Sequence, residues 1–287
     1  MTTFRLEVPL RWVDQDAQGH VNNALIVDYL QEARVAFMLN GPNAHILDGE
    51  CVVVSHRVEF LRPVVFDLEP VVVELSVGRV RAAQVTFGYD VLHRGELVAR
   101  ARSVVPVVNP ETGAPRRLTA GERSWFESWS TQVEPLRELG RWRVGERAYE
   151  SDFHVRWSDL DPYGHVNNVR MFDIVAEARI RMNPGDQTRT RMDEALSQGL
   201  RWMVARQDVK YRAPIQYRLA PYRVRTAYAR VGNTSMTLAA EVLDPASGTV
   251  HARSLTVLVC GDDQGRPVPV PAGIAAGLDL WPAVQLA

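Results

Sequence analysis

Cysteine is scarce in this chain of 287 residues, and long hydrophobic runs are missing. The two cysteines, Cys51 and Cys260, cannot form a disulfide framework, and neither has the spacing of a metal-binding or redox motif. We expect both to be small apolar residues of strands. No segment approaches the roughly 18 consecutive apolar residues of a membrane-spanning helix, and the first residues lack the apolar stretch of a secretory signal. These absences predict a cytoplasmic protein that does not contact membranes.

Lysine is almost absent, because Lys210 is the only lysine among 33 basic residues. The arginines are balanced by 34 acidic residues, which leaves a formal net charge of -1. Proteins that bind nucleic acids usually carry a basic excess, so this balance predicts no nucleic-acid partner. Hydrophobic residues make up 46% of the chain and charged residues 23%, which is typical of a folded globular protein.

An internal repeat is the strongest feature of the sequence. Residues 11–34 read RWVDQDAQGHVNNALIVDYLQEAR and residues 156–179 read RWSDLDPYGHVNNVRMFDIVAEAR, with 13 of 24 positions identical. Farther along, Val58 and Pro63 align with Val209 and Pro214, and Ala101-Arg102-Ser103 matches Ala252-Arg253-Ser254. A repeat of this length indicates a duplicated domain rather than a solenoid unit.

Both copies predict the same order of elements, a short strand, one helix and four further strands. The apolar residues Ile26, Leu30, Ala33 and Phe37 recur at helical spacing, and one helix with consecutive antiparallel strands makes an α+β domain. We expect a first strand at about 4–13 and 152–159 and a helix at about 23–39 and 168–182. The later strands are expected near 50–61, 69–79, 83–93 and 97–108, and near 201–212, 221–231, 234–244 and 249–260.

These elements divide the chain into four parts. Thr119 and Glu122 match a capping box, which predicts a helix from 119 to 129 between the copies. The segment after Cys260 is rich in Pro and Gly, which predicts an extended stretch on the surface. The expected parts are a first domain at 1–109, a linker with a short helix at 110–148, a second domain at 149–262 and a tail at 263–287.

The repeated motif D-x-D-x-x-G-H-V-N-N carries the candidate chemistry. Its first half is predicted to end a strand, so that Asp14 and Asp16 point to the same side. Gly19 allows a tight turn, and Asn22 or Asn23 can cap the helix that follows. In the second copy the corresponding residues are Asp159, Asp161, Gly164, Asn167 and Asn168.

A helix start offers backbone N–H groups and a positive dipole end where a developing oxyanion can be held. A carboxylate beside such donors can activate water against a thioester, or attack it directly. His20 and His165 can hydrogen-bond the carboxylate or move a proton, and bracing of the turn is the alternative role for both. The Asn side chains likewise have two possible roles, as helix caps or as part of the oxyanion site.

The motif resembles the 4-hydroxybenzoyl-CoA thioesterase-like branch of the hotdog superfamily, and it is similar to that of the plant acyl-ACP thioesterases. The resemblance covers about 1–109 and 149–260. It implies a tandem hotdog fold, each half an antiparallel sheet wrapped around a central helix. It also implies acyl-CoA thioesterase activity with no cofactor or metal beyond the coenzyme A of the substrate.

The resemblance assigns roles to particular residues. The catalytic carboxylates are Asp16 and Asp161, accompanied by His20 and His165. Arginines near the strand before Pro63 and Pro214 are expected to meet coenzyme A phosphates, and sites built from both halves are implied. The plant enzymes have an Asn where this chain has Gln18 and Tyr163, which argues against an acyl-ACP substrate, and Tyr163 can reshape the second pocket. The oxyanion donors fall at Val21, Asn22 and Asn23 and at Val166, Asn167 and Asn168, and the phosphate-binding candidates are Arg57, Arg62 and Arg212.

Other interpretations stay open. Glu32 and Glu177 repeat on the helix and are alternative catalytic carboxylates, or members of ion-pair networks with Arg34 and Arg179. A mixed-ligand metal site would use Asp14, Asp16 and His20.

Competing functions are a hotdog hydratase or dehydratase, an acyl-ACP thioesterase, and a non-catalytic acyl-CoA binding module. The packing of Trp12, Trp157 and Trp202 is expected to set pocket depth. The expected assembly is a monomer, with the two hotdogs paired within one chain, or a homo-oligomer of such pairs.

Overall fold

The computed structural model describes residues 3–182, 199–275 and 277–286. The chain divides into two compact units, Met1–Arg137 and Glu138–Ala287, each of which contains one copy of the repeat. The division falls inside the segment predicted as a linker. One part of that segment therefore belongs to each unit.

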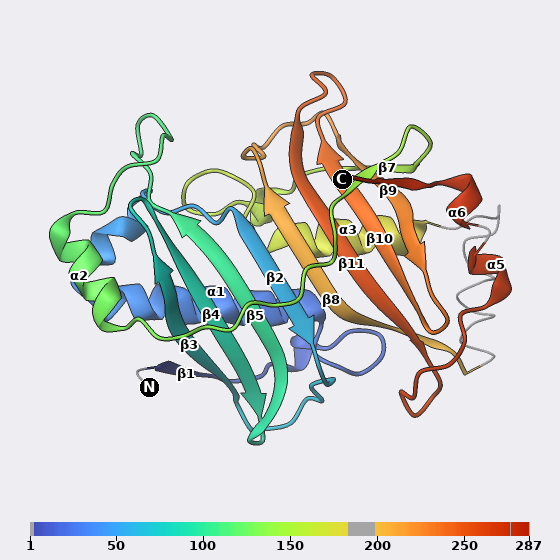
Figure 1. The fold of residues 1–287 in the computed structure, drawn as a ribbon, viewed down its shortest axis with the longest axis horizontal. Coiled ribbons are helices and arrows are strands. Elements are labelled where there is room, and N and C mark those ends of the chain that lie inside the picture. The colour runs from blue at the N-terminus through green and yellow to red at the C-terminus, as the bar shows by residue number, and fades with distance from the viewer. Residues whose placement is uncertain (1–2, 183–198, 276, 287) are drawn as a thin grey trace. The chain divides into compact units, whose positions relative to one another are not determined.

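The first unit is an antiparallel sheet packed against one long helix (Figure 1). Its strands are hydrogen-bonded in the order β1-β3-β4-β5-β2. The helix begins at Asn23 as predicted, because Asn22 accepts a hydrogen bond from the Ala24 N–H. The elements are β1 (Phe4–Val8), η1 (Trp12–Asp14), α1 (Asn23–Leu39), η2 (Ala44–Leu47), β2 (Ser55–Phe60), β3 (Val71–Val80), β4 (Gln84–His93), β5 (Glu96–Pro106) and α2 (Ala120–Ser128).

The second unit repeats this arrangement, with strand order β7-β9-β10-β11-β8 around the helix α3. The five strands of the sheet and the helix α3 take the places of their counterparts in the first unit, so the predicted α+β duplication is confirmed. The elements are β6 (Trp142–Val144), β7 (Tyr149–Phe153), η3 (Trp157–Asp159), α3 (Arg170–Arg181), β8 (Arg201–Tyr211), β9 (Tyr222–Val231), β10 (Ser235–Leu243), β11 (Val250–Gly261), α5 (Ala272–Ala275), α6 (Gly277–Leu280) and β12 (Ala283–Gln285).

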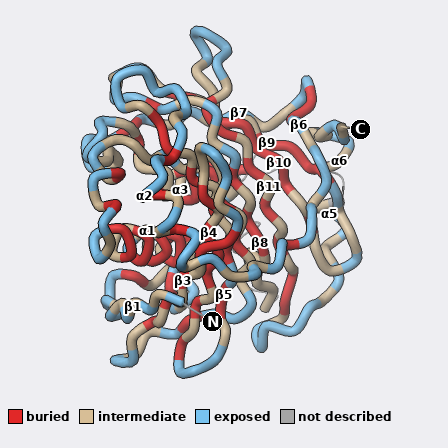
Figure 2. The backbone as a smooth tube through the Cα atoms, turned by 60° about the vertical axis from the view of Figure 1, so that its left-hand side comes forward, coloured by how far each residue is buried: buried red, intermediate tan, exposed pale blue. Residues whose placement is uncertain are grey.

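The core of the first unit lies between α1 and the sheet, where buried segments of both face each other (Figure 2). The side chains of Val27, Leu30 and Ala33 are 0% exposed and follow one face of the helix. Phe37 packs edge-on against Phe87 of β4, with ring centroids 6.1 Å apart. The hydrophobic periodicity of α1 thus fixes which of its faces meets the sheet.

Strand pairing in the second unit differs from the first by two residues. Val58 pairs with Ala101 in the first unit, whereas Val209 pairs with Ser254 in the second. The sequence match of Ala101 with Ala252 is therefore not the structural match. The connection between β10 and β11 is longer than that between β4 and β5, and a shift of two residues keeps every side chain on its original face.

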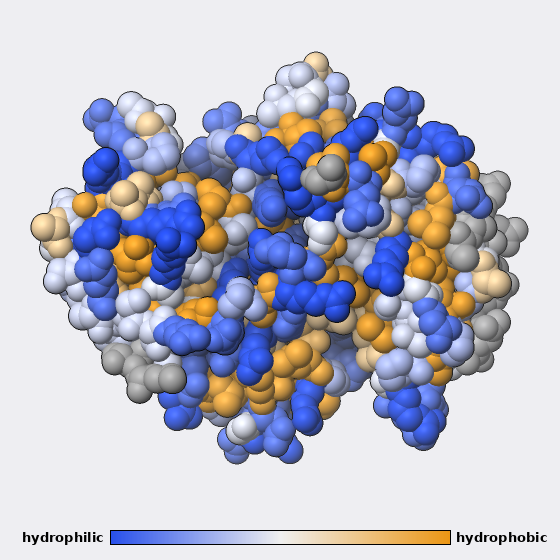
Figure 3. All heavy atoms as spheres, viewed as in Figure 1, coloured by the Kyte–Doolittle hydropathy of each residue, from blue (hydrophilic) through white to orange (hydrophobic). Residues whose placement is uncertain are grey.

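The outer face of each sheet is crossed by a segment that the sequence predicted as linker or tail. In the first unit, residues after α2 run across the strands (Figure 1), and the Thr131 N–H donates to the Val77 carbonyl at 2.9 Å. Glycine makes room for this crossing, because a Cβ atom at Gly88 would lie 2.6 Å from Val133 Cγ1. The space-filling view in Figure 3 shows hydrophilic and hydrophobic side chains interspersed over the molecular surface on this side.

In the second unit, β6 pairs with β12, and Val144 of β6 packs against Ala227, Ala229 and Ala239 of the sheet. The tail was predicted to be extended, and this prediction is wrong in part, because the tail contains α5 and α6 and ends in β12. Among the described residues, no helix is long and apolar enough to cross a membrane.

Candidate active site

The motif of the first unit folds into a tight turn around Asp16. Asp16 Oδ1 accepts hydrogen bonds from the Gln18 N–H at 2.8 Å and the His20 N–H at 3.3 Å. The Asp16 N–H donates to the His20 carbonyl at 2.7 Å. Gly19 has φ +77°, which only glycine adopts at little cost. The turn therefore fixes one carboxylate oxygen of Asp16.

The second unit repeats this turn around Asp161. Asp161 Oδ1 accepts from the Tyr163 N–H at 2.9 Å and the His165 N–H at 3.3 Å. Gly164 has φ +78°, and the Asp161 N–H donates to the His165 carbonyl at 2.8 Å. The two copies agree closely although Ala17-Gln18 stands in one and Pro162-Tyr163 in the other, so the turn does not depend on these residues.

The second oxygen of each carboxylate, Oδ2, accepts no hydrogen bond from any residue that the structure describes. Asp16 and Asp161 are both partly exposed. An ionised carboxylate can accept several hydrogen bonds, so Oδ2 is available to water or substrate. The backbone holds one oxygen of each carboxylate, and the other has no hydrogen-bond partner among the described residues.

The first aspartate of the motif has a different role, which corrects the expectation from strand geometry. Asp14 ends the 3-10 helix η1 rather than a strand, and it is 1% exposed. Its carboxylate accepts from the Arg11 side chain at 2.9 Å and from the Tyr29 hydroxyl at 2.8 Å. Burial opposes ionisation, but the hydrogen bonds from Arg11 and Tyr29 outweigh it and hold the pKa of Asp14 below its ordinary value.

This pairing also argues against the metal ligand set of Asp14, Asp16 and His20, because both oxygens of Asp14 are already bound by cationic or phenolic donors. In the second unit, Asp159 accepts from the Arg156 N–H at 2.7 Å, and Ile174 stands where the first unit has Tyr29. The first aspartate of the motif is a structural residue in both copies.

Most of the proposed oxyanion donors are already used. The Val21 N–H donates to the Val64 carbonyl and the Asn22 N–H to the Asp14 carbonyl. Val166 and Asn167 bond the carbonyls of Ile215 and Asp159 in the same way. These four amides were predicted as donors, and that prediction is wrong because they hold the motif against the strand loop and the 3-10 helix.

At the start of α1, the Asn23 N–H donates to no acceptor among the described residues. The Asn22 carboxamide serves as the helix cap, and Asn167 accepts from the Val169 N–H at 3.1 Å. In the second unit the carbonyl of Asn168 accepts from the Tyr211 hydroxyl at 2.7 Å. The Asn23 N–H therefore remains the candidate oxyanion donor of the first unit, and the role of the Asn168 N–H in the second unit stays a prediction.

The arginines expected near phosphate lie on or just after strands. Arg57 is on β2 opposite Arg102. Arg62 is exposed and 3.5 Å from Glu96. Arg212 follows β8 and is also exposed. Tyr163 is 38% exposed, and it lies on the surface of its turn.

The helix carboxylates Glu32 and Glu177 are exposed. Glu177 pairs with Arg181 at 3.5 Å, whereas Arg34 is buried and donates to the Tyr89 hydroxyl at 3.4 Å. The predicted ion pairs of these glutamates with Arg34 and Arg179 are not formed, because two residues along a helix lie on different faces.

Comparison with protein families matches residues 10–129 and 155–278 to a single family, the thioesterase-like superfamily. The two matched segments contain the two copies of the motif. The chain belongs to the thioesterase-like superfamily. The prediction of a thioester hydrolase agrees with this membership and is confirmed at the level of the family. A comparison with curated proteins finds no sequence match.

Solved structures share the tandem arrangement over their full length. An acyl-ACP thioesterase from Bacteroides thetaiotaomicron is 17% identical, with 90% of this chain and 98% of that chain covered and a TM-score of 0.68. A 12:0-ACP thioesterase from Umbellularia californica is 18% identical, with coverages of 91% and 98% and a TM-score of 0.70. A protein from Lactobacillus plantarum described as an oleoyl thioesterase is 14% identical, with coverages of 93% and 97% and a TM-score of 0.72. At these identities the likeness establishes the tandem hotdog fold.

Sequence reasoning on this thioesterase-family chain missed an aromatic pair beside each motif. Trp12 is 75% exposed and packs edge-on against Phe66, with ring centroids 5.6 Å apart. Trp157 is also 75% exposed and packs against Tyr217 at 5.4 Å. The two tryptophans were expected to influence pocket depth, but they lie at the surface. The repeat itself was the available signal, because both partners occupy equivalent positions in the two copies.

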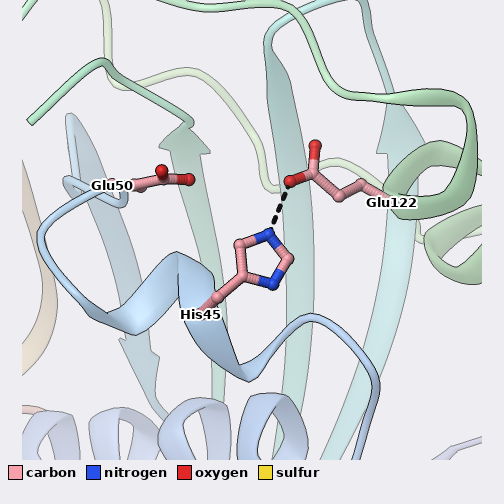
Figure 4. A group of neighbouring side chains, drawn as sticks. All are labelled: His45, Glu50 and Glu122. Atoms are coloured by element: carbon pink, nitrogen blue, oxygen red, sulfur yellow. Dashed lines mark hydrogen bonds and ion pairs between the residues drawn. The ribbon is translucent and has the colours of Figure 1, made fainter.

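A second polar cluster lies away from the motif, where η2 meets α2 (Figure 4). His45, Glu50 and Glu122 offer ligand atoms within 4.8 Å of one another, and His45 Nε2 lies 2.9 Å from Glu122 Oε1. Arg116 donates to Glu122 at 2.8 Å and also bonds Glu50. A guanidinium among these donors opposes a second cation, so the cluster is an ion-pair network that holds α2 in place.

Proposed function

We propose that this protein hydrolyses acyl-CoA thioesters to a carboxylic acid and free coenzyme A. The observation that carries the proposal is the duplicated turn, in which the backbone fixes Oδ1 of Asp16 and Asp161 while Oδ2 stays open. Membership in the thioesterase-like superfamily supports the reaction type. A cytoplasmic location and an assembly built from paired hotdogs belong to the same proposal, which involves no metal or organic cofactor.

The proposed chemistry begins at Oδ2. As a general base, the carboxylate removes a proton from water, and the resulting hydroxide attacks the thioester carbon. As a nucleophile, it attacks the same carbon and forms an anhydride that water then hydrolyses. In either case the C–S bond breaks and the coenzyme A thiolate leaves. The carbonyl oxygen gains negative charge, which the Asn23 N–H at the start of α1 stabilises in the first unit.

His20 and His165 lie four residues after their aspartates, and their main-chain groups close the turn on both sides. Their imidazoles are partly exposed and can protonate the leaving thiolate. Arg57, Arg62 and Arg212 stay the candidates for the coenzyme A phosphates, and Tyr163 for contact with substrate. Glu32 and Glu177 remain alternative carboxylates.

A carrier-protein thioester is the second candidate substrate, because two of the full-length structural neighbours are described as acyl-ACP or 12:0-ACP thioesterases. We favour coenzyme A because Gln18 and Tyr163 stand where the plant acyl-ACP motif has an Asn. A non-catalytic acyl-CoA binder would not need an open carboxylate at the same place in both units.

The substrate test follows release of free thiol from acyl-CoAs ranging from acetyl to palmitoyl and from benzoyl-CoA, beside the same acyl groups on a carrier protein. The proposal predicts a higher kcat/KM for coenzyme A esters. Higher kcat/KM on the carrier protein would move the assignment to an acyl-ACP thioesterase. Binding of acyl-CoA without turnover on either series would favour the binding module.

Single variants then test the two sites. Asp16→Asn and Asp161→Asn keep the size of the side chain and its capacity to accept the turn hydrogen bonds. Each variant is expected to lose the turnover of its own unit. If both sites are active, each single variant keeps part of the wild-type kcat, and the two losses add up to the wild-type value. Glu32→Gln and Glu177→Gln are the controls, and a greater loss in these would transfer the catalytic role to the helix.

A further inference from the structure

The two sheets differ at the centre of the face that packs against the helix. In each unit, four residues on adjacent strands pair directly with one another and therefore share a face. The first unit has Leu75, Tyr89, Ala101 and Val58 in this row, whereas the second unit has Thr226, Ala240, Ser254 and Val209. Only valine is common to both rows, and the second row has two hydroxyl side chains where the first has aliphatic ones.

This row faces α3. Tyr228 and Leu238 are the next directly paired residues on the same side of β9 and β10. They belong to a buried cluster with Met182, the C-cap residue of α3. Thr226 and Ser254 are 1% and 5% exposed, so their hydroxyl groups are enclosed beneath the helix rather than facing water.

Four buried side-chain atoms in this region have no hydrogen-bond partner among the residues that the structure describes. They belong to the helix α3 and to the three strands β8, β9 and β11: Arg179 Nη1, Gln207 Nε2, Thr226 Oγ1 and Ser254 Oγ. Gln207 is 2% exposed and pairs with Thr256, in the row next to Ser254. A fifth such atom, His251 Nε2, lies at the bulge near the start of β11.

In the first unit, the equivalent helix and strand positions have hydrogen-bond partners that the second unit lacks among its described residues. Arg34 occupies the helix position of Arg179 and donates to the Tyr89 hydroxyl at 3.4 Å, but Ala240 replaces that tyrosine. His56 bonds Ser103 at 2.7 Å, where the second unit has Gln207. Arg179 is partly exposed as a residue, yet its Nη1 atom is buried. Burial lowers the pKa of Arg179 to about 10.

The chemistry of these groups points to one class of ligand. Guanidinium, carboxamide and hydroxyl groups can all donate hydrogen bonds, and a carboxylate only accepts them. A buried donor without a partner costs roughly 1–3 kcal/mol, and a buried guanidinium requires a counter-charge. We propose that the α3-facing side of the second unit binds a carboxylate over Ala240, in the place that corresponds to the Tyr89 hydroxyl. Its donors are Arg179 of α3 together with Thr226 and Ser254, which lie on the strands to either side of Ala240.

The carboxylate has two possible sources, which the experiments distinguish. One is the free end of a substrate whose acyl group carries a second carboxyl group, and this link rests on the proposed thioesterase function. The other is a small free carboxylate that occupies the site independently of catalysis. Both would satisfy the same donors.

The binding experiment does not depend on turnover. Thermal unfolding of the full chain is followed with acetate, succinate and glutarate against chloride at equal ionic strength. Carboxylates are expected to raise the unfolding temperature of the wild type more than chloride does. Ala240→Tyr, which introduces the residue of the first unit, and Arg179→Met should lose this increment.

Arg181→Met is the matched control, because this arginine is on the same helix but its side chain is 57% exposed. It should keep the increment. A second test variant, Thr226→Leu with Ser254→Ala, uses residues that the first unit already accommodates at these positions, so it should fold and reduce the increment. The proposal would be overturned if carboxylates raised the unfolding temperature of Ala240→Tyr as much as that of the wild type. That result would indicate that the donors bind ordered water rather than an anion.

The kinetic experiment compares adipoyl-CoA with hexanoyl-CoA, which share a chain length. If the acyl group supplies the carboxylate, the ratio of their kcat/KM values should fall roughly tenfold in Ala240→Tyr, the change expected for losing a charged hydrogen bond. Stabilisation by free carboxylates without preference for adipoyl-CoA would assign the site to a free carboxylate. Absence of all thioesterase activity would remove the proposed function, while the unfolding experiment would still decide the carboxylate site.

Discussion

At the scale of single residues, the two aspartates of the motif have separate roles. Asp16 and Asp161 keep one oxygen open, whereas Asp14 has both oxygens bound and is buried. The motif D-x-D therefore combines a structural carboxylate with a candidate catalytic one. Sequence spacing does not distinguish the two aspartates. The difference arises because Asp14 ends the 3-10 helix η1 and is bound there by Arg11 and Tyr29.

Asp14→Asn is expected to lower the free energy of unfolding of the first unit by about 1–3 kcal/mol, because it removes the charge that binds Arg11 and Tyr29. The pKa of Asp14 lies below its ordinary value, so its stabilising contribution is complete above the ordinary aspartate range. The contribution is lost as the pH falls through the lowered pKa. Urea unfolding at neutral and acidic pH measures both effects.

Asp159→Asn is the matched variant in the second unit. It should cost less than about 1 kcal/mol, because Ile174 replaces the tyrosine and the side chain is partly exposed. Equal losses in the two units would contradict the structural role assigned to Tyr29. Loss of kcat in Asp14→Asn without loss of folding would transfer catalysis to the first aspartate.

The glycines of the turns give a second residue-scale prediction. Gly19→Ala and Gly164→Ala meet no neighbouring atom within 4 Å, so their cost comes from the positive φ alone, about 1 kcal/mol. The same variants should lower kcat, because Asp16 and Asp161 are positioned by these turns. Chemical unfolding and thiol release measure the two effects. Wild-type kcat with reduced stability would indicate that the turn geometry is not needed for turnover.

At the scale of elements, the ion-pair network around Glu122 attaches α2 to the first unit. Glu122 is 3% exposed, caps its own helix by accepting from the Thr119 N–H, and binds Arg116 and His45. The hydrogen bond from Arg116 is the main cause that lowers the pKa of Glu122 to about 2, despite burial. The segment that follows α2 crosses the outer face of the sheet, so this network also anchors that crossing.

Glu122→Gln should reduce the free energy of unfolding by about 1–3 kcal/mol at neutral pH. The folded-state pKa of about 2 lies below the ordinary value of 4.5. The stabilisation is therefore complete above pH 4.5 and is lost as the pH falls towards 2. Wild-type stability should decline over this window, and the variant should decline less. Parallel pH profiles of the two proteins would contradict the assignment.

The two units also form one equivalent contact in which the acidic residue has changed sides. Asp67 binds His93 at 3.1 Å in the first unit, and Arg218 binds Asp244 at 2.8 Å at the corresponding positions in the second. The aspartate lies in the loop after β2 in the first unit and directly after the end of β10 in the second. In both units this contact attaches the loop after β2 or β8 to the end of a hairpin. The attached loop carries Phe66 beside Trp12 in the first unit and Tyr217 beside Trp157 in the second.

At the scale of the whole molecule, the repeat in the sequence predicted the duplication, the long helices and all the main strands. It could not predict the shift of two residues in β11, because Ala252-Arg253-Ser254 matches Ala101-Arg102-Ser103 in sequence although Ser254 takes the place of Ala101. Such a shift preserves the face of every side chain, so hydrophobic alternation does not reveal it.

The candidate site was predictable only in part. Asp16 and Asp161 followed from the motif, but the use of Val21 and Asn22 as donors to distant carbonyls depends on the loop after β2. The crossing segments were also missed. Their sequences lack strand periodicity, and they are held by small residues of the sheet, Gly88 in one unit and Ala239 in the other.

The most direct test of the account is the kcat/KM for acyl-CoA hydrolysis of the double variant Asp16→Asn with Asp161→Asn, measured on protein with an unchanged unfolding transition. General-base catalysis typically contributes roughly 10²–10⁴-fold, and we predict a loss of that size. A value within about threefold of the wild type would contradict the assignment of both carboxylates, because the reaction would then proceed without either of them.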